Sequence, residues 1–124
     1  MSFKKSQKLY EKGLVNLVGA VNSPVRAFTS VGGNPLFIKR GICSQIIDVD
    51  GNKYVDLVLS YGPMVLGHRH KKVQKAVYKA LKNGYSFGAS TENEITLAKI
   101  VCDAFPGMDK VRFVNSGTEA VLSG

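Results

Sequence analysis

The sequence has no tryptophan and only two cysteines, Cys43 and Cys102, among its 124 residues. The cysteines lie far apart, without a C-x-x-C pair or flanking histidines, which excludes a disulfide framework and a zinc site. No apolar run approaches the length of a membrane span, and the lysine-bearing N-terminus has no apolar signal-peptide core. These absences predict a soluble, cytoplasmic protein with reduced, buried thiols.

Acidic residues are also scarce, because 9 aspartates and glutamates stand against 17 lysines and arginines, giving a net charge of +8. Such a charge is compatible with nucleic-acid or acidic-surface binding. Many of the lysines lie in Lys71–Lys82, around one apolar stripe with helical spacing. The stretch lacks interleaved arginines and exposed aromatics, so we interpret it as a solvated helix face that binds no nucleic acid. A small basic binding module without catalysis is the alternative.

Strand patterns occupy the middle of the chain. Leu36–Ile38, Gln45–Val49 and Lys53–Leu57 are rich in β-branched and aromatic residues, and Asp50-Gly51 is a strong tight-hairpin signal. This region therefore predicts a small three-stranded antiparallel sheet.

Two groups of possible metal ligands in and after this region are incomplete. Asp48, Asp50 and Asp56 lack the remaining ligands and the closing glutamate of a calcium loop. His68 and His70 are two residues apart, which does not place both on one helix face. We interpret the aspartates as turn and strand-edge groups, His68 as a loop-ordering residue, and His70 as part of a helix N-terminus.

Two further helices are expected. A lysine-bearing segment from residue 2 to about 18 predicts a short helix that is broken near Gly13. Thr91, with Glu94 three residues later, forms the capping box of a helix that Phe105-Pro106-Gly107 closes.

The end of the chain combines a strand pattern, a polar turn and a helix. Val111–Val114 predicts a buried strand, and Glu119–Leu122 favours helix. Free N–H groups at a helix start attract anions, to which Ser116 and Thr118 add hydroxyl donors, while Gly117 permits close approach. The pattern therefore predicts a phosphate site. A helix cap with nothing bound is the alternative, and the local pattern alone favours it.

A second candidate site lies in the loop that Pro24 fixes. Arg26 is a single cation on this loop, flanked by Ser23, and its planar fork suits a carboxylate. The residues alone favour the alternative, a solvated surface arginine.

Five motifs in this order resemble the class III aminotransferases, and more narrowly the glutamate-1-semialdehyde 2,1-aminomutase family. They are VNSPVRAF (21–28), DVDGNKYVD (48–56), SYGPMVLGH (60–68), SFGASTENEITLA (86–98) and VRFVNSGTEA (111–120). The hairpin and the last motif are common to many class III transaminases. VNSPVRAF together with SYGPMVLGH is more particular to the aminomutases. The likeness runs from about Asn16 to the end of the chain.

The resemblance implies an α/β fold, the N-terminal part of a fold-type I transferase that depends on pyridoxal phosphate (PLP). Residues 1–59 would be an N-terminal segment with the antiparallel sheet. Residues 60–124 would begin the large cofactor domain, with its first strand and the start of a helix.

The resemblance also implies roles for individual residues. Ser116, Gly117 and Thr118 match the family's site for the phosphate of PLP or pyridoxamine phosphate. Ser23 and Arg26 match the loop that holds the substrate carboxylate. The third substrate-binding candidate is Tyr61, at a position where members carry an aromatic residue, often tryptophan.

For a complete enzyme the resemblance implies an intramolecular amino exchange that converts glutamate-1-semialdehyde to 5-aminolevulinate, a porphyrin precursor. It implies a homodimer and glutamyl-tRNA reductase as an upstream partner. No position here matches the Schiff-base lysine, so we expect the 124 residues to contain no catalytic residue and to be inactive alone. Another class III transaminase, acting on an ω-amino acid, is the alternative, and the Ser23–Arg26 loop argues against it.

Overall fold

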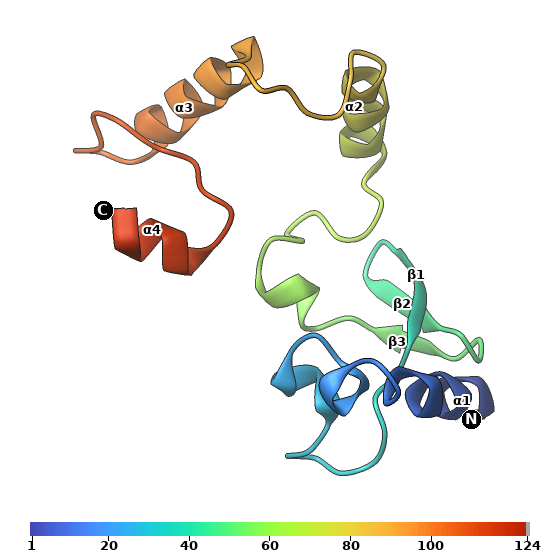
Figure 1. Ribbon diagram of the computed structural model, residues 1–124. Helices are drawn as coiled ribbons and strands as arrows, with labels where there is room; N and C mark the ends of the chain where they lie inside the picture. The colour runs from blue at the N-terminus through green and yellow to red at the C-terminus, as the bar shows by residue number, and fades with distance from the viewer. Residues whose placement is uncertain (124) are drawn as a thin grey trace. The chain divides into compact units, whose positions relative to one another are not determined.

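The computed structural model describes residues 1–123. Two compact units are present, Met1–Lys79 and a second that begins at Ala80. The first contains helix α1 (Lys4–Gly13) and strands β1 (Ile38–Ile42), β2 (Gln45–Asp48) and β3 (Lys53–Val55), and α2 (Lys71–Leu81) begins in it (Figure 1). The second contains α3 (Glu92–Ala104) and α4 (Gly117–Ser123). The predicted boundary at residue 59 concerns a complete protein and stays a prediction.

The predicted antiparallel sheet is confirmed, in the order β1-β2-β3. Its register pairs Arg40 with Ile47 and Ile46 with Tyr54. The first strand was placed wrongly, because β1 overlaps the predicted Leu36–Ile38 only at Ile38. The residues of β1 after Ile38 are mostly polar and have no strand pattern of their own. They form a strand because they pair with β2, so tertiary context overrides local propensity here.

The hairpin turn that follows β2 caps helix α1. The carboxylate of Asp50 accepts the backbone N–H groups of Lys5 (2.8 Å) and Ser6 (2.9 Å), and the Asn52 side chain donates to the Ser2 carbonyl (2.7 Å). Phe3, at the start of the helix, offers no side-chain cap of its own. A residue from the turn thus satisfies N–H groups that a helix start leaves open.

Asp48 closes the same hairpin from inside. It is fully buried and accepts the Asn52 N–H (2.8 Å), the Asn52 side-chain amide (2.8 Å) and the Tyr54 hydroxyl (2.9 Å). Burial alone would raise the pKa of Asp48, but these hydrogen bonds outweigh it and the pKa is lowered. The interpretation of Asp48 and Asp50 as turn carboxylates is confirmed.

The helices predicted in residues 2–18, 71–82 and 91–105 are present, although α1 covers only Lys4–Gly13 of the first range. Helix α1 ends at Gly13, and α2 ends one residue before Lys82. The capping box of α3 is confirmed, since the N–H and the hydroxyl of Thr91 both donate to the Glu94 carboxylate at 2.9 Å.

The predicted strand Val111–Val114 is wrong. This segment has no regular secondary structure, and no strand lies in the described part of the second unit. A strand is stabilised by pairing as well as by its side chains, and no neighbour supplies that pairing here. Helix α4 nevertheless begins at Gly117, directly after the predicted turn.

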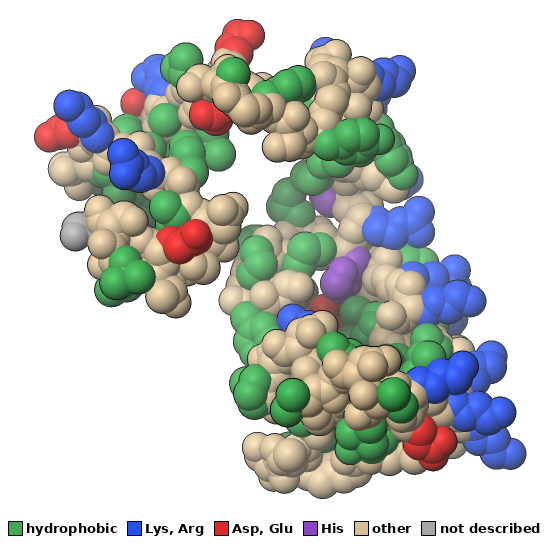
Figure 2. All heavy atoms as spheres, viewed as in Figure 1, with side chains coloured by type: hydrophobic (Ala, Val, Ile, Leu, Met, Phe, Trp, Pro, Cys, Tyr) green, Lys and Arg blue, Asp and Glu red, His purple; other side chains and the backbone are tan. Residues whose placement is uncertain are grey.

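Few side chains are buried in the described residues. Ala20 and Ile47 are buried hydrophobic residues, whereas apolar side chains of α2 and α3, including Val77 (49% exposed) and Ile95 (71%), face solvent (Figure 2). Cys43 is exposed and Cys102 is half-buried, so the prediction of buried thiols is wrong. None of the described helices is both long and apolar enough to cross a membrane.

Candidate functional site

The turn that carries Tyr61 follows strand β3 and has an unusual backbone. Leu59, Ser60 and Tyr61 have φ values of 50°, 56° and 63°, and Gly62 follows at 121°. Residues with a side chain rarely adopt such angles, and here three do so in succession. We call Leu59–Tyr61 the left-handed turn. Tyr61 is 66% exposed at its end.

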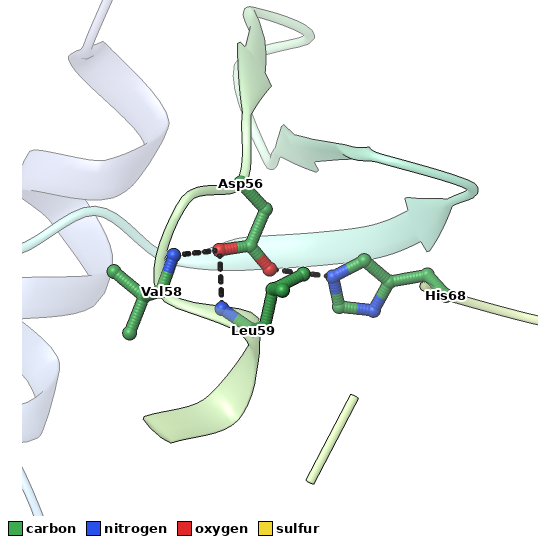
Figure 3. A network of polar contacts seen from close by, with 4 residues as sticks. All are labelled: Asp56, Val58, Leu59 and His68. Carbon is green, nitrogen blue, oxygen red and sulfur yellow. Dashed lines mark hydrogen bonds and ion pairs between the residues drawn. The ribbon is translucent and has the colours of Figure 1, made fainter. Parts of the chain in front are cut away.

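An aspartate–histidine pair lies at the base of the left-handed turn (Figure 3). Asp56 Oδ2 lies 2.6 Å from His68 Nε2, while Asp56 Oδ1 accepts the N–H groups of Val58 (3.0 Å) and Leu59 (3.1 Å). The hydrogen bond to His68, followed by those from Leu59 and Val58, lowers the pKa of Asp56. The lowered pKa favours the ionised carboxylate, which accepts the hydrogen bonds from the backbone of the turn.

His68 is fixed from two further directions. Its backbone pairs with Cys43, through Cys43 N–H to the His68 carbonyl (3.0 Å) and His68 N–H to the Cys43 carbonyl (2.7 Å). Gly41 makes room for its ring, because a Cβ atom at Gly41 would lie 2.4 Å from His68 Cγ. The interpretation of His68 as a loop-ordering residue is confirmed.

A groove of about 960 Å³ opens beside this pair. Val55, Val65 and Leu66 are among its apolar lining residues, and Asp56 and His68 add the ionisable pair. The side chains of Asp56 and His68 are 8% and 19% exposed, so the pair is largely shielded from water.

Ser23 and Arg26 lie on one short helical turn, Pro24–Ala27, in which Ser23 occupies the N-terminal flank. The Arg26 N–H donates to the Ser23 carbonyl at 2.9 Å. Arg26 is exposed, and its guanidinium makes no ion pair within residues 1–123. Its donors are therefore available to a carboxylate.

The predicted phosphate turn contains a capping box of its own. Ser116 Oγ accepts the Glu119 N–H (3.2 Å) and donates to the Glu119 carboxylate (3.1 Å), which also accepts the Asn115 N–H (2.9 Å). The spacing S-x-x-E is the sequence signature of a capping box, so this contact could have been predicted from Ser116 and Glu119.

The capping box leaves two backbone donors open. The N–H groups of Gly117 and Thr118 have no partner within the described residues, as expected for the first turn of a helix. A Cβ atom at Gly117 would meet no other atom within 4 Å, so the space beside it is open. Two parallel N–H groups and the Thr118 hydroxyl can together bind an anion.

The structure brings some of the predicted residues together. Ser23 and Arg26 share one turn, and Tyr61 lies on a different turn of the same unit. Ser116, Gly117 and Thr118 are contiguous and belong to the second unit. The Asp56–His68 pair was missed as a pair, because its members lie 12 positions apart in the sequence and no pattern between them predicts contact.

The sequence model of the Aminotransferase class-III family matches residues 28–124. The chain belongs to this family. It is 58% identical, over 99% of its length, to the glutamate-1-semialdehyde 2,1-aminomutase of Thermodesulfovibrio yellowstonii, of which it spans 29%. This chain thus spans less than a third of that class III relative.

Solved transaminase structures confirm the predicted α/β transferase fold. A β-phenylalanine aminotransferase from Variovorax paradoxus is 32% identical with a TM-score of 0.89, and the match covers 97% of this chain and 27% of that one. A transaminase with PLP bound is 30% identical with a TM-score of 0.88, covering 99% and 28%.

Proposed function

We propose that the chain is the N-terminal part of a glutamate-1-semialdehyde 2,1-aminomutase, an enzyme that forms 5-aminolevulinate for porphyrin synthesis. The observation that carries the proposal is the 58% identity to an aminomutase over nearly the whole chain. The motifs VNSPVRAF and SYGPMVLGH, which resemble the aminomutases in particular, support it.

The phosphate turn fits the cofactor of this family. Gly117 and Thr118 offer unpaired N–H groups at a helix start, with open space beside the glycine. PLP, when bound, would serve as the carrier of the amino group and as an electron sink for the carbon next to it. Ser116, Gly117 and Thr118 would hold its phosphate. Ser116 keeps the helix capped through Glu119 before the anion arrives, and its hydroxyl hydrogen, which Glu119 accepts here, would turn to the phosphate when the cofactor binds.

The exposed loop of the first unit would hold the substrate. Arg26 would bind the carboxylate of glutamate-1-semialdehyde with two parallel N–H donors, and Ser23 would add a hydroxyl. Tyr61 would place an aromatic face and a hydroxyl beside the reacting end. These contacts orient the substrate, and orientation lowers the barrier because the reacting groups need not find each other in solution.

We assign no catalytic residue to residues 1–124. The lysine that anchors the cofactor and moves the protons would come from the part of the enzyme that this chain does not span, as would the acidic partner of the cofactor ring. The complete enzyme would be a homodimer and would receive its substrate from glutamyl-tRNA reductase.

The second candidate is a transaminase that exchanges amino groups between two substrates. The likeness to the β-phenylalanine aminotransferase favours it, since that structure matches 97% of the chain. A shared fold at 32% identity, however, says less about substrate than 58% identity to an aminomutase does.

An assay of the product of the complete reading frame separates the two candidates. The purified protein would be supplied with glutamate-1-semialdehyde alone, and separately with a panel of amino donors and keto acids. We expect 5-aminolevulinate to form without any second substrate. Turnover only when a donor and an acceptor are both present would assign the chain to a transaminase instead.

A further inference from the structure

The backbone of the left-handed turn is energetically unfavourable for the residues that form it. Leu59, Ser60 and Tyr61 all have side chains, yet all three have positive φ. Such backbones persist only where their surroundings hold them, and they concentrate at sites of function. Tyr61, at the end of this turn, is the residue we place beside the substrate.

The contacts that hold the turn converge on one carboxylate. Asp56 Oδ1 accepts the N–H groups of Val58 and Leu59, directly where the backbone enters the turn. Asp56 Oδ2 is held in turn by His68 Nε2 at 2.6 Å. The aspartate is thereby fixed at both oxygens and cannot rotate away from the turn.

The same pair closes the loop 57–67 at its two ends. His68 lies at the far end of the loop and is itself bound to the end of β1, through its backbone pairing with Cys43. Gly41 in β1 admits the imidazole ring at a distance that no side chain would allow. The loop that carries Tyr61 is thus attached to the rigid sheet through His68 and Asp56.

We propose that Asp56 and His68 are positioning residues that hold the left-handed turn and so orient Tyr61 toward the substrate. The proposal rests on the proposed function, since it deepens the role given there to Tyr61. Neither side chain needs to touch the substrate. Their effect on turnover passes through Tyr61.

The test is a double-mutant cycle in the product of the complete reading frame. Asp56→Ala removes both oxygens, Asp56→Asn keeps an acceptor for the N–H groups of Val58 and Leu59, and Tyr61→Ala removes the presented side chain. If Asp56 acts through Tyr61, Asp56→Ala lowers kcat/KM for glutamate-1-semialdehyde at least tenfold in the parent, but less than threefold when Tyr61 is already alanine. Asp56→Asn restores most of the loss. Equal losses in both backgrounds would overturn the proposal.

Matched controls separate positioning from general damage. Asp103→Ala removes an exposed aspartate paired with Lys99, and His70→Ala removes an exposed histidine as the control for His68→Ala. Both controls should leave kcat/KM unchanged, whereas His68→Ala should follow the pattern of Asp56→Ala. Bound cofactor, measured by its absorbance, should be retained in every variant.

Amide hydrogen exchange gives a readout that does not depend on the reaction. In Asp56→Ala and His68→Ala the Val58 and Leu59 amides should exchange at least tenfold faster than in the parent, and in Asp103→Ala at the parent rate. Unchanged exchange at Val58 and Leu59 would overturn the proposal whatever the substrate proves to be. If the parent protein formed no 5-aminolevulinate while the two variants still showed the faster exchange, the proposed function would be contradicted, and the role of Asp56 and His68 in holding the turn would stand.

Discussion

Asp50, in the turn between β2 and β3, caps helix α1, which begins about 45 residues earlier in the chain. Its carboxylate accepts the Ser6 N–H at 2.9 Å. The contact joins a local turn to the N-terminus of the chain. It also explains why the turn contains an aspartate at a position where turn geometry alone accepts several residues.

This contact predicts how the first unit responds to acid. Burial would raise the pKa of Asp50, but hydrogen bonds from Lys5 and Ser6 lower it below the ordinary value of 3.8. A lowered folded pKa stabilises the fold fully above 3.8, and the stabilisation is lost as the pH falls through the folded value. We expect the Lys5 and Ser6 amides of the complete protein to begin losing protection from exchange as the pH falls below 3.8, and to lose it fully below the lowered pKa of Asp50.

Asp50→Ala should remove the same protection at neutral pH, with Asp103→Ala as the exposed control. If the Lys5 and Ser6 amides stayed protected in Asp50→Ala, the cap would not depend on this carboxylate.

The 124-residue chain by itself should associate or unfold without cooperativity. Leu122 (81% exposed), Ile95 (71%) and other large apolar side chains face solvent, and such surface normally packs against protein. Sedimentation and thermal unfolding of the isolated chain check this expectation. A monodisperse monomer with one sharp unfolding transition would show that the exposed faces need no partner.

Several elements could be read from the sequence because local signals determine them. The Thr91–Glu94 capping box, the break at Gly13 and the apolar stripe of α2 all act within a few residues. The Asp50-Gly51 hairpin signal likewise needs only its neighbours.

Other elements depend on residues far along the chain, and there the predictions were wrong or missing. Val111–Val114 has a strand composition but no pairing strand, and β1 forms in a polar stretch because β2 pairs with it. The left-handed turn, Leu59–Tyr61, contains no glycine, so the local sequence does not predict its positive φ values. Its supports, Asp56 and His68, meet only after folding.

Arg26→Lys in the complete enzyme should impair substrate use much more than cofactor binding. Lysine keeps the charge but loses the planar pair of donors that matches a carboxylate. The loss of one charge-assisted hydrogen bond should cost about 1.5–3 kcal/mol, roughly ten- to a hundredfold in kcat/KM. Arg40→Lys, on the exposed side of β1, is the matched control. Equal kinetics in both variants would make Arg26 an ordinary surface residue.

Thr118→Val should weaken cofactor retention and leave the fold intact. Valine has nearly the shape of threonine, but one donor to the phosphate is lost while the N–H groups of Gly117 and Thr118 remain. We expect a partial loss of about 1.5–3 kcal/mol in cofactor binding. Thr96→Val, on exposed α3, should have no effect on retention. Cofactor dissociation followed by absorbance gives the comparison.

Gly117→Val should be worse than Thr118→Val, because its side chain would fill the open space beside the two N–H groups. Parental retention in both variants would mean that Ser116–Thr118 forms a helix cap and nothing more.

The most direct test of the account is a chimera in which this chain replaces the matching segment of the Thermodesulfovibrio yellowstonii aminomutase. The 58% identity extends over 123 residues, which is 99% of this chain, so nearly the whole chain has a counterpart to replace. If Ser116–Thr118 bind the cofactor phosphate and Ser23 and Arg26 bind the substrate carboxylate, the chimera should bind PLP. It should also convert glutamate-1-semialdehyde to 5-aminolevulinate with no second substrate. A folded chimera that retains PLP but forms no 5-aminolevulinate would contradict the account.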